Sequence, residues 1–199
     1  LSADGQLAKD GQSAGSCSYR YLPASLTLPK GAPASPLPTF LSWQSEPLKE
    51  DLDVVGDAEL ELDASITATD TAWLVTLQDV ASDGSAIDVT AGWLRAALRE
   101  VDEEASEPGA PNLRADNPLA VVPGAKTRYR IPLVSTARRF AQGHRLRVVV
   151  ASDDVSAGTP AIMGFHHQSP VMQSTNTVWA TSVLRLPILH TDPEGSRDT

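Results

Sequence analysis

The sequence is poor in the residues on which disulfide, metal and cofactor chemistry depend. Its 199 residues include a single cysteine, Cys17, which excludes an internal disulfide. The four histidines lack the regular spacing of zinc ligands, and the adjacent pair would point to opposite faces of a strand: His144, His166, His167 and His190. We therefore expect no metal and no cofactor.

Charge and hydropathy exclude further classes of function. The formal charge of −9 argues against nucleic acid and against an anionic membrane surface as partners. No apolar run approaches the roughly 18 residues that a membrane span needs. The sequence begins with Leu1 and no signal peptide precedes it, so we read it as a piece of a longer protein, although a processed N-terminus would look the same. The compartment stays open, with the cytoplasm favoured.

Turn-forming residues are abundant. Fifteen prolines and thirteen glycines, with only 21% charged residues, indicate short strands joined by many turns rather than helices. A chain of this length suits one β-sandwich domain. It can bury about 70% of its unfolded surface, so it needs no disulfides or metals to fold.

The most informative stretch runs from Thr71 to Arg99 and reads as two apolar strands around a polar turn at residues 82–85. Trp73, Val75 and Leu77 alternate with residues that are also largely apolar, so we expect this strand to be covered on both faces. Residues 94–98 fit a helical period as well as a strand period, and periodicity does not decide between them.

Other segments alternate more simply. Residues 59–66 predict a strand with one dry and one solvated face, and residues 126–134 predict a strand with Tyr129, Ile131 and Leu133 directed inward. Residues 10–38 and 100–123 are rich in turn formers or acidic residues and are expected to be loops. The segment 190–199 is expected to be a polar, frayed tail.

Residues 11–15 read Gly-Gln-Ser-Ala-Gly, a literal match to the G-x-S-x-G motif of serine hydrolases. In a nucleophile elbow the serine lies on a strained turn between a buried strand and a helix. Neither flank of Ser13 supplies such an element, so we interpret the match as chance in a Gly/Ser-rich segment.

Four other sets of polar or aromatic residues have both a structural and a functional interpretation. For the acidic group Glu46, Glu50, Asp51 and Asp53 we favour a solvated turn over a cation site, because EF-hand spacing is missing. Arg95 and Arg99 share a strand face and favour structural ion pairs, whereas His144 is expected to fix its own turn by hydrogen bonding. The tryptophans favour core positions over a sugar platform: Trp43, Trp73, Trp93 and Trp179.

Several motifs together resemble one known domain. They are Gly92-Trp93-Leu94-Arg95, the Tyr- and Pro-rich pair of segments 19–23 and 36–39, Gly143-His144-Arg145-Leu146-Arg147 leading into Ser152-Asp153, and the ending Leu184-Arg185-Leu186-Pro187. Their order and spacing resemble the C-terminal domain shared by X-Pro dipeptidyl-peptidases, bacterial cocaine esterase and α-amino-acid ester hydrolases. The resemblance covers nearly the whole chain, and it favours a strand for residues 94–98.

The resemblance implies an all-β jelly-roll β-sandwich, galactose-binding-like, with about eight to ten strands in two packed, mostly antiparallel sheets. It implies one domain over residues 1–199, with residues 1–39 forming a strand-turn and a loop that crosses over a neighbouring α/β-hydrolase domain of the same parent protein. In this family the serine, aspartate and histidine of catalysis belong to that hydrolase domain, so no residue here is assigned a catalytic role.

The implied function is therefore that of an accessory domain, which packs on the catalytic domain of a peptidase or esterase and shapes its substrate pocket. The crossing loop carries four leucines that would face that domain: Leu22, Leu26, Leu28 and Leu37. In the isolated chain we expect this loop to be mobile or to be buried against a second copy. The alternative function is a freestanding carbohydrate-binding module, which would expose a flat Trp or Tyr, whereas an accessory domain would expose an apolar patch.

Overall fold

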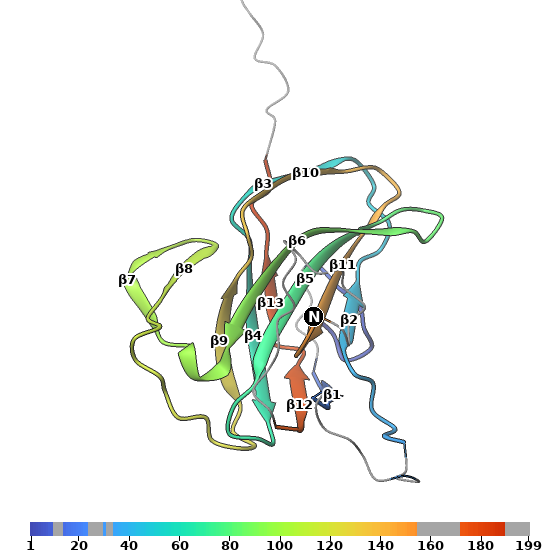
Figure 1. The fold of residues 1–199 in the computed structure, drawn as a ribbon. Coiled ribbons are helices and arrows are strands. Elements are labelled where there is room, and N and C mark those ends of the chain that lie inside the picture. Colours follow the sequence, from blue (N-terminus) through green and yellow to red (C-terminus); the bar gives the residue numbers. More distant parts are fainter. Residues whose placement is uncertain (10–13, 24–29, 31–33, 155–171, 190–199) are drawn as a thin grey trace, which may run out of the picture.

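The computed structural model in Figure 1 describes residues 1–9, 14–23, 30, 34–154 and 172–189. The described residues form strands and one short 3-10 helix, η1 (Ala96–Leu98). The strands, in chain order, are β1 (Ser16–Tyr21), β2 (Leu41–Gln44), β3 (Leu52–Gly56), β4 (Glu59–Ile66), β5 (Ala72–Val80), β6 (Ala86–Arg95), β7 (Val101–Glu107), β8 (Ala110–Leu113), β9 (Thr127–Pro132), β10 (Thr136–Phe140), β11 (Arg145–Ala151), β12 (Ser174–Trp179) and β13 (Val183–Arg185).

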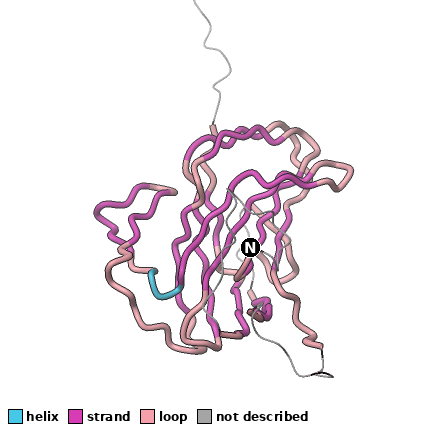
Figure 2. The backbone as a smooth tube through the Cα atoms, in the orientation of Figure 1, coloured by secondary structure: helices cyan, strands magenta, loops and turns pink. Residues whose placement is uncertain are grey.

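Two larger sheets make up the sandwich (Figure 2), and two further antiparallel pairs, β3–β10 and β7–β8, accompany them. The first, sheet B, has β4 at its centre, with β9 along one edge and β12 and β13 in succession along the other, and β1 pairs with β12. The second, sheet A, has the order β2-β11-β5-β6. Every pair of strands is antiparallel, so the prediction of an all-β sandwich of mainly antiparallel sheets is confirmed.

The core lies between these sheets and is built by the predicted alternation. From β4 it takes Leu60, Leu62 and Ile66, and from β5 it takes Trp73 and Val75, all of them almost fully buried. The inward positions predicted for β9 are buried as well. On the other face of β5, Leu74 and Thr76 are each only 5% exposed, so this strand is covered on both sides, as its two apolar faces predict.

The two sheets are joined at one edge by the segment that follows β9. The amide of Leu133 donates to the carbonyl of Ala58, at 2.8 Å, and the amide of Val134 donates to that of Ala91, at 2.9 Å. Gly92 makes this approach possible, because a Cβ at this position would lie 2.1 Å from the carbonyl oxygen of Pro132. The glycine of the predicted Gly-Trp-Leu-Arg motif therefore serves sheet-to-sheet contact.

The strand predicted for residues 94–98 is only partly correct. β6 ends at Arg95, and residues 96–98 turn into η1, whose first amide, that of Ala96, donates to the carbonyl of Thr71 at 2.9 Å. The good helix propensity of Ala-Ala-Leu is satisfied once β6 runs out of a pairing partner, since β5 begins at Ala72 opposite Arg95.

Two segments that were expected to be loops contain strands. β1 lies within residues 10–38 and directs Tyr19 and Tyr21 into the core, although its alternation is short and is flanked by Gly, Ser and Pro. β7 and β8 lie within residues 100–123 and form a hairpin that projects from the side of the sandwich in Figure 1. The acidic composition of β7 concealed it, because most of its side chains are exposed and carry no apolar alternation.

No helix among the described residues has the length and hydropathy to cross a bilayer.

Candidate functional site

One end of the sandwich encloses a buried polar cluster, which we call the Ser152 cluster: Tyr19, Thr71, Ser152, Ser174 and Asn176. The Ser152 hydroxyl is hydrogen-bonded to the hydroxyls of Tyr19, at 2.8 Å, and Thr71, at 3.2 Å, and it accepts from the Asn176 amide at 2.9 Å. Ser174 donates in turn to the Asn176 carbonyl oxygen at 2.7 Å. The cluster thus ties together the ends of β1, β11 and β12 and the residue before β5.

The electrostatics of this end keep its phenols neutral. Burial raises the pKa of Tyr19 far above its ordinary value, and burial together with the nearby Asp153 raises the pKa of Tyr21. The partners of Ser152 within the cluster are hydroxyl and amide groups, none of which is a base that would activate the serine. The arrangement holds these segments together through hydrogen bonds.

The crossing loop begins and ends beside this cluster. It leaves β1 at Leu22, and its base is closed by a hydrogen bond from the Arg20 amide to the Pro38 carbonyl, at 2.8 Å. Leu22 and Leu37, near the two ends of the loop, are half-buried. Leu26 and Leu28 lie outside the described residues, so the assignment of the four leucines to an interdomain face stays a prediction.

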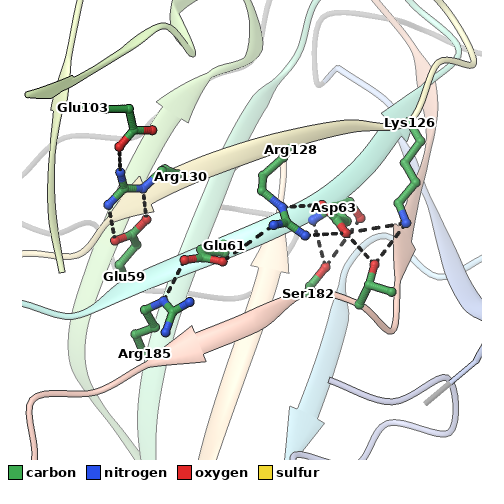
Figure 3. Close-up of polar contacts among 10 residues, drawn as sticks. Glu59, Glu61, Asp63, Glu103, Lys126, Arg128, Arg130, Ser182 and Arg185 are labelled. Carbon is green, nitrogen blue, oxygen red and sulfur yellow. Dashed lines mark hydrogen bonds and ion pairs between the residues drawn. The ribbon is translucent and has the colours of Figure 1, made fainter. Parts of the chain in front are cut away.

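The outer face of β4 carries a second polar assembly, shown in Figure 3, which we call the β4 charge lattice: Glu59, Glu61, Asp63, Glu103, Lys126, Arg128, Arg130 and Arg185. Arg130 of β9 binds Glu59 through Nε, at 2.5 Å, and Nη2, at 3.0 Å, and it binds Glu103 of β7 through Nη1 at 2.6 Å. The Glu59 side chain is only 1% exposed. This face of β4 was predicted to be solvated, but basic side chains largely cover it. These side chains form ion pairs with its buried carboxylates.

Asp63 is the most elaborately held carboxylate of the lattice. It accepts from Arg128 at 2.8 and 3.0 Å and from the Thr181 hydroxyl at 2.5 Å, with the Lys126 ammonium 3.5 Å away. These partners, with Arg128 foremost, lower the pKa of Asp63 to about 2 against the opposing effect of burial.

A bulge between β12 and β13 makes room for these contacts. Both strands pair with β4, and the chain between Val178, opposite Ala64, and Val183, opposite Glu61, is two residues longer than the matching part of β4. The Ser182 hydroxyl accepts the Asp63 amide at 2.9 Å, so the backbone group left unpaired by the bulge is satisfied.

Glu61 lies between two arginines of different strands (Figure 3). Arg185 of β13 donates through Nε to one carboxylate oxygen at 2.6 Å, and Nη1 of Arg128 lies 4.0 Å from the other. Both guanidinium groups are more than half exposed, whereas the Glu61 side chain is 17% exposed. On this face, the acidic side chains are therefore largely buried close to the sheet, and the arginine side chains lie over them toward the solvent.

The predicted roles of His144 and Arg99 need correction. The His144 ring does not bond to its own turn: Nδ1 lies 2.7 Å from the buried Asp79 of β5, which also accepts from Arg138 of β10 at 2.7 Å. Arg99 follows η1 instead of lying on a strand, and it donates to the carbonyls of Ala96, Leu119 and Ala120. Local spacing could not reveal the contacts with Asp79, Leu119 and Ala120, because these partners are 20 or more residues away, and only Ala96 is near Arg99 in the sequence.

The ion pair predicted for Arg95 is confirmed, with Asp70 as its partner at 2.5 Å. The acidic turn is only partly as predicted. Asp53 is not a solvated turn residue, since it lies on β3 and accepts from Arg139 at 2.7 and 2.6 Å. The Asp51 carboxylate accepts the amide of Gln142, at 2.8 Å.

The tryptophans divide into two pairs. Trp43 and Trp73 are buried in the core, as predicted. Trp93 and Trp179 are half-buried instead, and the Lys126 ammonium lies 5.3 Å from the centre of a Trp179 ring. None of the four tryptophans is largely exposed, and the carbohydrate-binding alternative stays a prediction.

Within the part of the chain that the structure describes, no three His, Cys, Asp or Glu side chains are grouped as metal ligands. Ser13, His166, His167 and His190 lie outside the described residues. The segment that follows Ser13 enters strand β1 at Ser16, where a nucleophile elbow would require a helix.

Comparison with known proteins decides the relationship suggested by the motifs. The family model for the X-Pro dipeptidyl-peptidase C-terminal non-catalytic domain matches residues 9–163. The chain belongs to this family. The match includes the crossing loop, the Gly92 motif, the β4 charge lattice up to Arg130 and the first part of the Ser152 cluster.

Relatives of this C-terminal domain include a protein named as a serine esterase in Mycobacterium tuberculosis, which is 31% identical over 126 residues and matches 59% of this chain and 19% of its own length. The cocaine esterase of a Rhodococcus species is 29% identical over 114 residues, which are 57% of this chain and 18% of the esterase. The chain thus spans about a fifth of these curated relatives.

Among solved structures, an α-amino acid ester hydrolase shares the fold with a TM-score of 0.72 at 19% identity, over 95% of this chain and 35% of the hydrolase. At this level of identity the likeness concerns the fold. In the solved protein, the region similar to this domain is about a third of a longer hydrolase chain.

Proposed function

We propose that this chain is the accessory β-sandwich domain of a serine hydrolase that acts on X-Pro peptides or on small esters, and that it packs on the α/β catalytic domain of its parent protein. The observation that carries the proposal is the match of residues 9–163 to a domain family described as non-catalytic and C-terminal. The solved ester hydrolase supports it, because a domain of this fold makes up about a third of that enzyme.

The finer part of the proposal is that the crossing loop forms one wall of the substrate pocket. Its ends are held at the Ser152 cluster, and the backbone bond between Arg20 and Pro38 closes its base. Apolar side chains on such a loop favour contact with a second surface, since each leaves area in water at about 25 cal/mol per Å². A rigid base with an apolar loop suits a part that must present one shape to a neighbouring domain.

The coarse proposal is tested by comparing this chain with its whole parent protein. The whole protein should hydrolyse an X-Pro dipeptide anilide or a p-nitrophenyl ester, and a fluorophosphonate should label a serine in its catalytic domain. The isolated chain should show neither turnover nor labelling. Labelling of the isolated chain that Ser13→Ala abolishes would place a nucleophile in this domain and overturn the proposal.

The finer proposal is tested in the whole protein with Leu28→Asp, using Val122→Asp as a control at a valine that is already 63% exposed. The loop variant should change the ratio of kcat/KM between a small and a bulky substrate severalfold, because a pocket wall discriminates by contact with the substrate. The control should leave that ratio unchanged. Equal ratios for wild type and Leu28→Asp would remove the loop from the pocket while leaving the accessory role intact.

A further inference from the structure

The β4 charge lattice presents its two signs of charge at different depths. The side chains of Glu59, Glu61 and Asp63 are 1%, 17% and 8% exposed. The side chains of Arg128 and Arg185 are 56% and 57% exposed. Although the chain as a whole carries a charge of −9, this face therefore offers guanidinium groups to any partner that approaches it.

Arg130 shows what a completed position in this lattice looks like. Its guanidinium group binds the buried Glu59 on the inner side and Glu103 of the β7–β8 hairpin on the outer side, at 2.6 Å. Glu103 is 70% exposed, so the outer carboxylate reaches the arginine from the solvent side. Because carboxylates cover it on both sides, the Arg130 side chain is only 20% exposed.

Arg128 and Arg185 each bind a largely buried carboxylate of β4, but among the described residues neither has a solvent-side carboxylate like the one that Glu103 supplies to Arg130. Arg185 uses only Nε, toward Glu61, and among the described residues its two Nη groups have no partner. Arg128 spends Nε and Nη2 on Asp63, and its Nη1 lies 4.0 Å from Glu61. The guanidinium groups of Arg128 and Arg185 face the two different oxygens of the Glu61 carboxylate, so they lie close enough to bind one partner together.

We propose that Arg128 and Arg185 dock an acidic surface segment of the catalytic domain, whose carboxylates take the positions that Glu103 takes at Arg130. The inference rests on the proposed function, because it is the catalytic domain that supplies the segment. Planar guanidinium groups with free N–H donors suit carboxylates, which they bind in a fixed geometry. In an extended segment, carboxylates two residues apart are about 7 Å from each other on one face and can reach both arginines.

The surroundings agree with a polypeptide partner. Val183, two residues before Arg185 in β13, is 42% exposed, and Trp179 is half-buried at the other end of the bulge. Apolar groups beside a charged pair are typical of the junction between the centre and the rim of a protein interface. A polyanion such as nucleic acid is disfavoured, because the charge of the rest of the domain repels it.

Carbodiimide crosslinking of the whole protein tests the proposal. Arg185→Lys keeps the positive charge and supplies an amine that the reagent joins to a carboxylate in direct contact. Arg139→Lys is the matched control, because Arg139 has a similar ion pair, 2.6 Å from Asp53, and side-chain exposures of 64% and 19%. The expected result is a crosslink from position 185 to an acidic residue of the catalytic domain, with at least about a fivefold higher yield than from position 139.

Salt and a neutral variant complete the test. The interdomain yield should fall severalfold between about 0.05 and about 0.5 M salt, because partly exposed ion pairs are screened. Arg185→Gln, which leaves Glu61 in contact with solvent and Arg128, should lower the melting temperature of the whole protein more than Arg139→Gln does.

Crosslinks from position 185 that stay within this domain, with equal effects of the two glutamine variants, would overturn the docking proposal even if the whole protein is an active hydrolase. A whole protein without hydrolase activity would instead count against the proposed function. A crosslink from position 185 to a different protein would contradict the chosen partner.

Discussion

The rings of Trp73 and Tyr129 meet across the sandwich with their centroids 5.2 Å apart and their planes tilted by 55°. Trp73 comes from β5 of sheet A and Tyr129 from β9 of sheet B, and the two side chains are 0% and 1% exposed. Tilted aromatic pairs of this kind contribute about 0.5–1.5 kcal/mol beyond the area that they bury. The contact joins the apolar hairpin to β9, which carries Arg128 and Arg130 on its opposite face.

Replacing Trp73 should test this contact. Trp73→Ala is expected to lower the free energy of unfolding by about 3–5 kcal/mol, because it leaves a large cavity between the sheets. Trp73→Phe should cost clearly less, since it keeps a ring in place and removes the indole Nε1–H, which is buried and has no hydrogen-bond partner among the described residues. Chemical denaturation of both variants measures the difference, and a loss below about 1 kcal/mol for Trp73→Ala would contradict a core role.

The stability of the domain should depend on pH through Asp63. The pKa of this carboxyl falls from 3.8 to about 2 on folding, so the folded protein favours the charged form. The stabilising effect is fully present above about pH 5 and is lost as the pH falls through 4 toward 2. We expect about 1–2 kcal/mol, less than the full shift implies, because Arg128 and Lys126 are about half exposed and solvent screens them.

Asp63→Asn provides the measurement. The difference in unfolding free energy between wild type and this variant should be constant above about pH 5 and should shrink on acidification. Asp53→Asn is the control, because it breaks an ion pair with Arg139 on the exposed β3–β10 pair. A difference that stays the same from pH 6 to pH 2 would mean that Asp63 is not stabilised as a carboxylate.

Gly92 should not tolerate even a methyl group. In Gly92→Ala the new Cβ would meet the Pro132 carbonyl oxygen at 2.1 Å and force the two sheets apart at this edge, at a cost of about 2–3 kcal/mol or more. In Gly84→Ala the added carbon meets nothing within 4 Å, and only the positive φ of 86° is unfavourable. Thermal melting should therefore separate the two variants, and equal melting temperatures would show that no close contact exists at Gly92.

Metal removal should leave the domain folded. The sequence lacks ligand spacing, and the described residues contain no group of three metal-ligating side chains. Melting curves with and without a chelator should coincide, since a structural metal contributes its binding free energy to folding. A large drop in melting temperature with the chelator would point to a ligand set that includes residues outside the described ranges.

The sequence predicts the core well, because burial selects apolar residues at a period of two in β4, β5 and β9. It also contains the signal for the β4 charge lattice. Glu59, Glu61 and Asp63 recur at period two in one strand, and three basic residues recur at period two from Lys126 in another. Which acid meets which base depends on the register, which places Asp63 opposite Arg128 and Glu59 opposite Pro132, and register is a property of the whole sheet.

The Ser152 cluster lay beyond sequence reasoning for a different reason. Its members come from four segments far apart in the sequence, with Tyr19 and its bonded partner Ser152 lying 133 residues apart, and each is an ordinary polar residue in its own segment. Only the meeting of four strand ends turns them into a buried network. The three missed strands, β1, β7 and β8, show the same limit, since β1 depends on its partner β12 and β7 and β8 depend on each other.

The hydrogen bond between the Arg20 amide and the Pro38 carbonyl makes the crossing loop an exchangeable part of the domain. Because its two ends are fixed at one place on the sandwich, doubling the length of the loop raises the entropic cost of closing it by only about 0.6 kcal/mol. Insertions, deletions or a transplanted loop from a relative can therefore be accepted with little effect on the two sheets. Under the proposed role of the loop, one scaffold would in this way acquire different substrate preferences while its two sheets stay the same.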